Sequence, residues 1–366
     1  MFEVLDWQRV ADPRAVVRRA VDELRAGRTV GFPTESSYAL VASGLNPEAV
    51  DRLHFMKDGR PEPLAAAVDG LFGARKWVPR LSPLAQRLAR RFWPGPLILH
   101  SAEGMEGGLA DLLPAGVRQV LSPDGSLRLR SPAHEAILDA VQLFAGPLVL
   151  CENAGATSAE LQQQSSDRID LLIDDGPSPS AQPPTVIQVQ GKNWSVLRPG
   201  ALTTEQVAQQ SACIVIFVCT GNTCRSPLAE GFCKKLLAER LGCTIEDLPR
   251  RGFYVLSAGL AAMMGGEAAA ESVAVAHDYG ADLARHQSRP LSEDLAAQAD
   301  FLIVMTRGHL SAITEYYPRL GCRPRLLCPQ GEDIADPVGA SREVYQACAV
   351  EIWRHLEPLV AEIAEG

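Results

Sequence analysis

The chain has 366 residues, of which 46% are hydrophobic and 22% charged, and its formal net charge is −9 at pH 7. This length is enough for two domains with cores of their own, and the composition excludes a fibrous or largely disordered protein. The negative balance excludes a global basic field, so nucleic-acid binding would need a local basic patch.

The N-terminal residues and the cysteines predict the compartment. MFEVLDWQRV lacks the charged and apolar regions of a signal peptide, and no apolar run in the chain is as long as a membrane span. The nine cysteines are irregularly spaced, and no pair has zinc-ligand spacing with histidines. We therefore expect a reduced, cytoplasmic protein with no membrane partner and no metal site.

The N-terminal half has the pattern of a mixed α/β domain. Helical patterns cover 13–26, 47–57 (with Asn46 as N-cap) and 81–93. Short apolar strands bounded by Gly, Pro and Asp are expected at 29–34, 96–100, 126–130, 147–151, 170–174 and 185–189, and 64–68 is a short apolar run. A closing helix at 203–210 places the domain boundary at 208–212, which predicts domains at 1–208 and 212–366.

Several landmarks follow one another along this half: FPTESSYAL, MKDGRPEPL, FWPGPLIL, LRLRSP, PLVLCENAG, TVIQV and LRPGAL. In order and spacing they resemble the YrdC-like threonylcarbamoyl-AMP synthase family. The resemblance implies a twisted, concave mixed sheet that takes ATP, threonine and bicarbonate as substrates and makes threonylcarbamoyl-adenylate for tRNA modification. It also implies a nucleotide and threonine site built from Thr34, Tyr38, Lys57, Arg60, Arg130, Asn153, Thr185 and Arg198.

The sequence departs from this family at positions that concern the nucleotide. The departures are YAL at 38–40 for YGL, an extra residue between Lys57 and Arg60, alanines at 65–67 for a histidine, CEN at 151–153 for Ser-Ala-Asn, and Pro184 for a serine. Lost polar groups and the added carboxylate of Glu152 both oppose binding of an anionic nucleotide. We expect the fold without synthase activity. Two alternatives are a bifunctional protein that retains that activity and a regulator that docks tRNA or double-stranded RNA on this domain.

The most informative stretch is CIVIFVCTGNTCRSP, residues 213–227. An apolar β-branched run predicts a buried parallel strand at 213–218, and a helical pattern begins at Pro227 with Ser226 placed to cap it. The loop amides and the helix dipole would then converge on one anion. Cys219 beside Arg225 at a helix N-terminus has its thiolate favoured, and Arg225 can grip two oxygens of a phosphate. The expected chemistry is attack of sulfur on phosphorus.

The Cys-x5-Arg-Ser spacing resembles the signature of the low-molecular-weight protein tyrosine phosphatase family, and the resemblance covers about 212–363. It implies a phosphate loop made of Thr220, Gly221, Asn222, Thr223, Cys224 and Ser226. It also implies that Asp336, in Asp336-Pro337, is the general acid. The resemblance implies a phosphorylated protein as substrate and no cofactor.

Two residues concern the substrate. Family members that act on phosphoarginine carry threonine at the position of Thr223, whereas tyrosine-specific members carry a larger aliphatic residue. Val338 stands where an aromatic side chain normally sandwiches a flat substrate group. We therefore expect phosphoarginine ahead of phosphotyrosine. Cys224 either packs the loop or forms a reversible disulfide with Cys219. The same fold also admits an arsenate reductase, but no cysteine occurs between Cys243 and Cys322 for its disulfide relay.

The rest of the C-terminal half alternates strands and helices, which predicts a doubly wound parallel sheet. Strands are expected at 213–218, 253–257, 301–305 and 325–328, and helices at 227–241, 267–280, 291–298, 308–317 and 341–363. Ligands bind beyond the carboxyl ends of such strands, where Cys219 falls.

Overall fold

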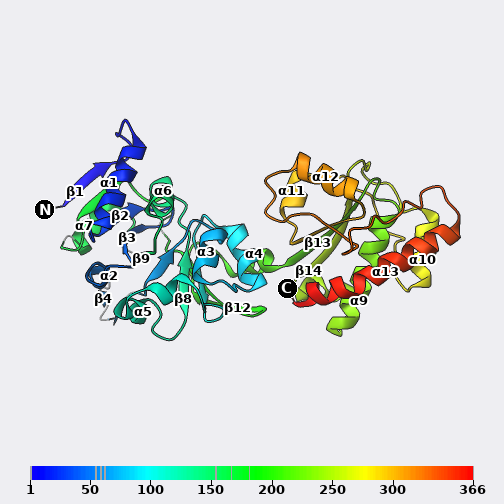
Figure 1. Cartoon of the computed structure of the whole chain (residues 1–366), viewed down its shortest axis with the longest axis horizontal. Coiled ribbons are helices and arrows are strands. Elements are labelled where there is room, and N and C mark those ends of the chain that lie inside the picture. Colours follow the sequence, from blue (N-terminus) through cyan, green and yellow to red (C-terminus); the bar gives the residue numbers. More distant parts are fainter. Residues whose placement is uncertain are drawn as a thin grey trace. The chain divides into compact units, whose positions relative to one another are not determined.

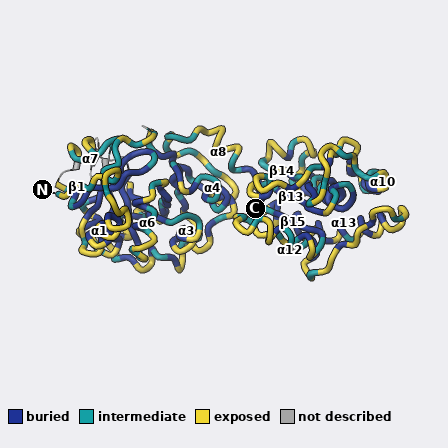
Figure 2. The backbone as a smooth tube through the Cα atoms, turned by 90° about the horizontal axis from the view of Figure 1, so that it is seen from above, coloured by how far each residue is buried: buried dark blue, intermediate teal, exposed yellow. Residues whose placement is uncertain are grey.

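The computed structural model describes residues 2–53, 56–57, 60–61, 63–152, 155–165, 167–180 and 182–365, with the backbone alone at 56–57, 60–61 and 165. The chain forms two compact units, Met1–Gln210 and Ser211–Gly366 (Figure 1). In each unit the buried residues concentrate along the central strands, as Figure 2 shows. Each unit therefore has a sheet and cores of its own.

Unit 1 is built on a ten-stranded mixed sheet with the order β1-β10-β2-β3-β9-β6-β8-β7-β11-β12. Parallel pairs such as β7 with β11 alternate with antiparallel pairs such as β7 with β8. The strands are β1 (Glu3–Asp6), β2 (Val30–Pro33), β3 (Tyr38–Ser43), β6 (Ala65–Ala67), β7 (Leu97–Ser101), β8 (Leu127–Arg130), β9 (Leu148–Cys151), β10 (Leu171–Asp174), β11 (Thr185–Gln190) and β12 (Asn193–Arg198). The expected mixed sheet is confirmed.

Helices cover both faces of this sheet. Helices α1 (Pro13–Arg25) and α6 (Glu135–Phe144) pack a core against β2, β9 and β10. The opposite core contains α2 (Pro47–Leu53), α3 (Leu71–Trp77), α4 (Pro83–Phe92) and α5 (Ala115–Leu121). The unit also has α7 (Ser158–Ser165), α8 (Thr204–Ser211) and a 3₁₀ turn at Leu109–Leu112. The sheet is therefore held between two helical layers.

The helix predicted at 47–57 in unit 1 ends earlier than expected. The helix begins as expected, since Asn46 Oδ1 accepts the Ala49 N–H at 3.0 Å, but it stops at Leu53 rather than at residue 57. Beyond it, β4 (Met56–Lys57) pairs antiparallel with β5 (Arg60–Pro61). The pairing consumes backbone groups that a continued helix would have used.

Unit 2 contains a four-stranded sheet of order β14-β13-β15-β16, and every pair in it is parallel. The strands are β13 (Cys213–Cys219), β14 (Phe253–Gly259), β15 (Phe301–Val304) and β16 (Arg325–Leu326). Figure 1 shows α11 and α12 on one side of the sheet and α9 and α13 on the other. The helices are α9 (Arg225–Leu241), α10 (Ala270–Asp278), α11 (Glu293–Ala297), α12 (Arg307–Tyr316) and α13 (Arg342–Glu365), with 3₁₀ turns at Ile245–Asp247 and Pro249–Arg251. The expected doubly wound parallel sheet is confirmed.

The start of α9 differs from the expectation. Cys224 is the N-cap residue and makes no side-chain cap bond, so Ser226 lies inside the first turn. The Ser226 hydroxyl is turned toward Cys219 instead, because the loop supplies it with other partners. Within the described ranges, no helix combines the length and apolar character needed to cross a membrane.

Candidate functional site

The loop between β13 and α9 surrounds the thiol of Cys219. Cys219 is the last residue of β13 and is 2% exposed. Its Sγ accepts the Asn222 N–H at 3.2 Å and lies 3.0 Å from Ser226 Oγ. A backbone N–H and a hydroxyl thus face the sulfur at the N-terminus of a helix, a setting typical of reactive cysteines. This geometry suits a nucleophile.

Asn222 gives the loop its shape. It lies in the left-handed region at φ +56° and is fully buried. Its amide donates to Ser226 Oγ at 2.9 Å and to Ser257 Oγ at 2.8 Å. Because Ser226 Oγ receives this bond, its own hydrogen is free for Cys219 Sγ or for the Ala258 carbonyl at 3.3 Å. The network therefore holds the Ser226 hydroxyl within hydrogen-bonding reach of the Cys219 sulfur.

Three residues that sequence analysis did not assign to the site complete this network. Ser257 donates to Glu230 Oε2 at 2.6 Å, and His286 Nε2 lies 2.8 Å from the Asn222 carbonyl. Ser257 comes from β14 and Glu230 from α9, so only the fold brings them to the loop. The spacing of a strand serine or a helical glutamate carries no signal of such a contact.

Arg225 is held at the opposite side of the loop. Its side chain is 4% exposed, Nη1 donates to the Ile334 carbonyl at 3.0 Å, and Nη2 pairs with Asp336 Oδ2. Nε is buried and has no partner among the described residues. Burial without a partner is costly, so this N–H is a donor available to a bound oxyanion. Arg225 and Asp336 thus meet, although 110 intervening residues separate them in the sequence.

The segment 259–269 contacts the backbone of the phosphate loop and holds it in place. The N–H of Ala261 donates to the Thr220 carbonyl and that of Ala269 to the Thr223 carbonyl, both at 2.9 Å. Gly259 lies so close that an added Cβ would stand 2.5 Å from the Thr220 carbonyl oxygen. Only glycine permits this approach. The backbone of the loop is therefore fixed by its surroundings and not only by its own turn.

The two residues that concern the substrate lie at the mouth of the loop. Thr223 is half-buried, with Oγ1 3.6 Å from Cys224 Sγ, and Val338 is 67% exposed. Cys224 is buried, its Sγ lies 3.3 Å from the hydroxyl of Tyr345, and it forms no disulfide with Cys219 in this structure.

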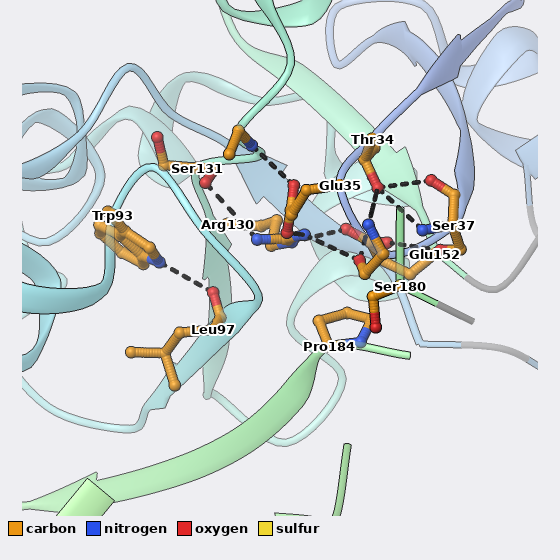
Figure 3. Close-up of polar contacts among 12 residues, drawn as sticks. Thr34, Glu35, Ser37, Trp93, Leu97, Arg130, Ser131, Glu152, Ser180 and Pro184 are labelled. Atoms are coloured by element: carbon orange, nitrogen blue, oxygen red, sulfur yellow. Dashed lines mark hydrogen bonds and ion pairs between the residues drawn. The ribbon is translucent and has the colours of Figure 1, made fainter. Parts of the chain in front are cut away.

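In unit 1, Arg130 is the centre of a buried ionic cluster (Figure 3). It is fully buried and lies between two carboxylates, with Nη2 2.5 Å from Glu35 Oε1 and Nε 2.8 Å from Glu152 Oε1. Nearby acids raise the pKa of the Arg130 guanidinium, while its burial acts in the opposite direction. Glu35 also accepts the Ala133 N–H at 2.7 Å, and Glu152 accepts from Ser37 at 3.4 Å. The cation is neutralised inside the protein.

The other residues proposed for the nucleotide and threonine site either make bonds within the protein or lie outside the described residues. Thr34 joins the Arg130 region but bonds to its own turn, accepting the N–H groups of Ser36 and Ser37. Tyr38 and Thr185 are buried in structural bonds to Asp174 and Leu202, and Arg198 reaches the Pro184 carbonyl at 3.4 Å. The side chains of Lys57 and Arg60 and all of Asn153 lie outside the described residues.

The parallel sheet of unit 2, with a cysteine and an arginine around one anion cradle at its carboxyl edge, has the architecture of cysteine-dependent phosphatases. The family model described as low molecular weight phosphotyrosine protein phosphatase matches residues 214–366. A protein-arginine-phosphatase of Bacillus subtilis is 34% identical over 153 residues, which are 41% of this chain and 95% of that protein. The C-terminal half of the chain belongs to the low-molecular-weight phosphatase family.

The N-terminal half matches a second family model, Sua5/YciO/YrdC, described as telomere recombination, over residues 22–200. A threonylcarbamoyl-AMP synthase of Mus musculus is 31% identical over 212 residues, covering 53% of this chain and 71% of that protein. One of Pyrococcus abyssi is 30% identical over 199 residues, covering 52% of this chain and 56% of that protein. The chain thus joins a domain of this family to a phosphatase domain, and it spans only about half of the archaeal relative.

Proposed function

We propose that the C-terminal domain removes phosphate from phosphorylated proteins through a phosphocysteine intermediate. The observation that carries the proposal is the set of donors around Cys219. Asn222 N–H and Ser226 Oγ face the sulfur, and Arg225 Nε has no partner in the part of the chain that the structure describes. The thiolate attacks phosphorus, a P–S bond forms and the bond to the leaving group breaks. The loop amides and Arg225 hold the equatorial oxygens.

In this proposal Asp336 supplies the proton. A leaving alkoxide, phenolate or guanidine departs most easily when it is protonated, and the carboxyl of Asp336 beside Arg225 is half open to solvent. The same carboxylate then takes a proton from the water that cleaves the phosphocysteine, so phosphate is released and both groups return to their starting states. No metal takes part in these steps.

We propose phosphoarginine as the preferred phosphoresidue. The hydroxyl of Thr223 gives the mouth of the loop a polar face, which can orient water or the planar, hydrogen-bonding guanidinium of the leaving group. The identity to a protein-arginine-phosphatase supports this preference. The exposed Val338 gives no flat aromatic wall for either substrate. The test is the ratio of kcat/KM for a phosphoarginine peptide and a phosphotyrosine peptide, and a ratio below one would refute the preference.

For the N-terminal domain we propose that it lacks threonylcarbamoyl-AMP synthase activity. The support is that Glu35 and Glu152 already occupy Arg130, so this cation is not free for a phosphate. The full chain with Cys219→Ser, which silences the phosphatase, serves for the test. Threonine-dependent pyrophosphate release from ATP and bicarbonate would refute the proposal and support a bifunctional enzyme.

We further propose that the domains span 1–208 and 212–366 and that the protein acts in the cytoplasm, where thiols stay reduced. The cysteines form no disulfide in the structure, which is consistent with such a compartment. A role of the N-terminal domain in docking tRNA or double-stranded RNA is the alternative for which gel-shift titration of the full chain is the direct test. Retention of RNA at physiological salt would favour it.

A further inference from the structure

His309 contacts the phosphate loop from a separate element. It is the third residue of α12, and its N–H is capped by Thr306 Oγ1 at 3.2 Å. The side chain is 7% exposed, and its Nε2 lies 2.9 Å from Oγ1 of Thr220, the first loop residue after Cys219. A histidine buried at the edge of an anion cradle needs an explanation beyond core packing, because its ring bonds to a residue of that cradle.

The surroundings of His309 favour the neutral ring. Burial, followed by the positive charge of Arg225, lowers the pKa of His309, while Asp336 and Asp333 act weakly in the opposite direction. These three charged groups come from α9 and from the segment before α13, so charges from both elements act on the ring. A second cation beside Arg225 would be repelled.

The bonding of the two ring nitrogens indicates where the single proton lies. Nδ1 is buried and has no partner among the described residues. A proton there would be a buried donor without an acceptor, close to the positive Arg225. A proton on Nε2 instead donates to Thr220 Oγ1. The hydroxyl of Thr220, an exposed residue of the phosphate loop, then has its own hydrogen free to donate.

We propose that His309 is a positioning residue that turns the Thr220 hydroxyl into a donor for the bound phosphate. The inference rests on the proposed phosphatase function and adds to it a recognition element from α12. The proposal requires that His309 affects phosphate affinity only when the Thr220 hydroxyl is present. A ring that only fills space would act independently of that hydroxyl.

The test is a double-mutant cycle on the full chain, with the affinity for inorganic phosphate measured by calorimetry. His309→Phe keeps the ring volume without a donor, His309→Gln keeps a donor at similar reach, and Thr220→Val removes the hydroxyl. We expect about tenfold weaker phosphate binding in His309→Phe and in Thr220→Val, no further loss in the double variant, and affinity near that of the wild type in His309→Gln.

Two outcomes would overturn the inference. One is unchanged phosphate affinity in Thr220→Val, and the other is an equal loss from His309→Phe in the presence and absence of Thr220. Because affinity is measured without turnover, these outcomes are separate from the failure of the proposed function. That failure would be a wild-type protein without hydrolysis of p-nitrophenyl phosphate.

Discussion

Asn222 and Ser226 are joined by a 2.9 Å hydrogen bond from Nδ2 to Oγ, and the same Oγ lies 3.0 Å from the sulfur of Cys219. One side chain thus holds the loop backbone in the left-handed region and also sets the direction of the hydroxyl that faces the nucleophile. Shape and electrostatics of the cradle depend on the same residue. Two substitutions of Asn222 can tell the effect of its backbone conformation from the effect of its side chain.

Asn222→Gly and Asn222→Ala should separate the two contributions. Both lose the bonds to Ser226 and Ser257, so we expect kcat/KM for p-nitrophenyl phosphate to fall by about 10²-fold, the size of a misplaced catalytic group. Alanine also resists positive φ, so Asn222→Ala should be less stable than Asn222→Gly by about 1 kcal/mol in urea unfolding. Wild-type kinetics in the glycine variant would contradict the role of the side chain.

Replacement of the two reacting groups tests the mechanism. Cys219→Ser should abolish turnover, since a serine hydroxyl is not ionised at neutral pH, and Asp336→Asn should lower kcat by about 10²-fold or more. Cys243→Ser and Asp278→Asn, which change the same residue types outside the loop, are the matched controls and should retain activity. The readout is steady-state hydrolysis with and without EDTA, which should have no effect. Turnover in Cys219→Ser would refute the phosphocysteine route.

Thr223→Ile should change the choice of substrate. The larger aliphatic side chain removes the polar face and favours an apolar ring, so the ratio of kcat/KM values should move toward phosphotyrosine by about 1–3 kcal/mol. The two peptides should share one sequence, so that only the phosphoresidue differs. If the wild type already prefers phosphotyrosine and the variant keeps its ratio, Thr223 does not determine specificity.

Arg130→Met should destabilise unit 1 strongly. The substitution leaves Glu35 and Glu152 facing each other without their cation, and the loss of one partner of a buried pair costs about 3–5 kcal/mol. Arg80→Met is the control, because Arg80 pairs with Glu106 at the surface and should cost less than about 1 kcal/mol. Urea unfolding followed by tryptophan fluorescence measures both. Equal small losses of stability in the two variants would mean that the ion pairs of Arg130 do not stabilise the folded state.

Acidification should lower stability in both units. Burial lowers the pKa of His100 in unit 1 and of His309 and His355 in unit 2. Below the ordinary histidine pKa the unfolded chain binds protons that the folded chain refuses, so stability falls as the pH drops from 7 to 5. Thermal unfolding across this range gives the slope, and His309→Gln should make it shallower. An unchanged slope would show that His309 does not contribute.

The sequence by itself predicted the fold class of both halves and the candidate reacting groups. The β-branched run before Cys219, the Cys-x5-Arg spacing and the strand–helix alternation follow from local pattern, because a strand, a tight loop and a helix N-terminus are specified within about 15 residues. Landmarks along the first half likewise predicted the mixed sheet. Local pattern misplaced the cap of α9 and the end of α2. Ser226 bonds to Cys219 and Asn222 of its own loop, and a short antiparallel pair follows α2.

Only the tertiary structure decided which distant residues complete the sites. Ser257 and His309 reach the phosphate loop because β14 and β15 flank β13, and that order is a property of the sheet rather than of any segment. In unit 1, the sequence indicated that Glu152 adds a negative charge, and the fold shows that this carboxylate forms an ion pair with Arg130. Arg130 ends β8, Glu152 follows β9 and Glu35 follows β2, so their pairing depends on the order of the strands in the sheet and no local pattern could reveal it.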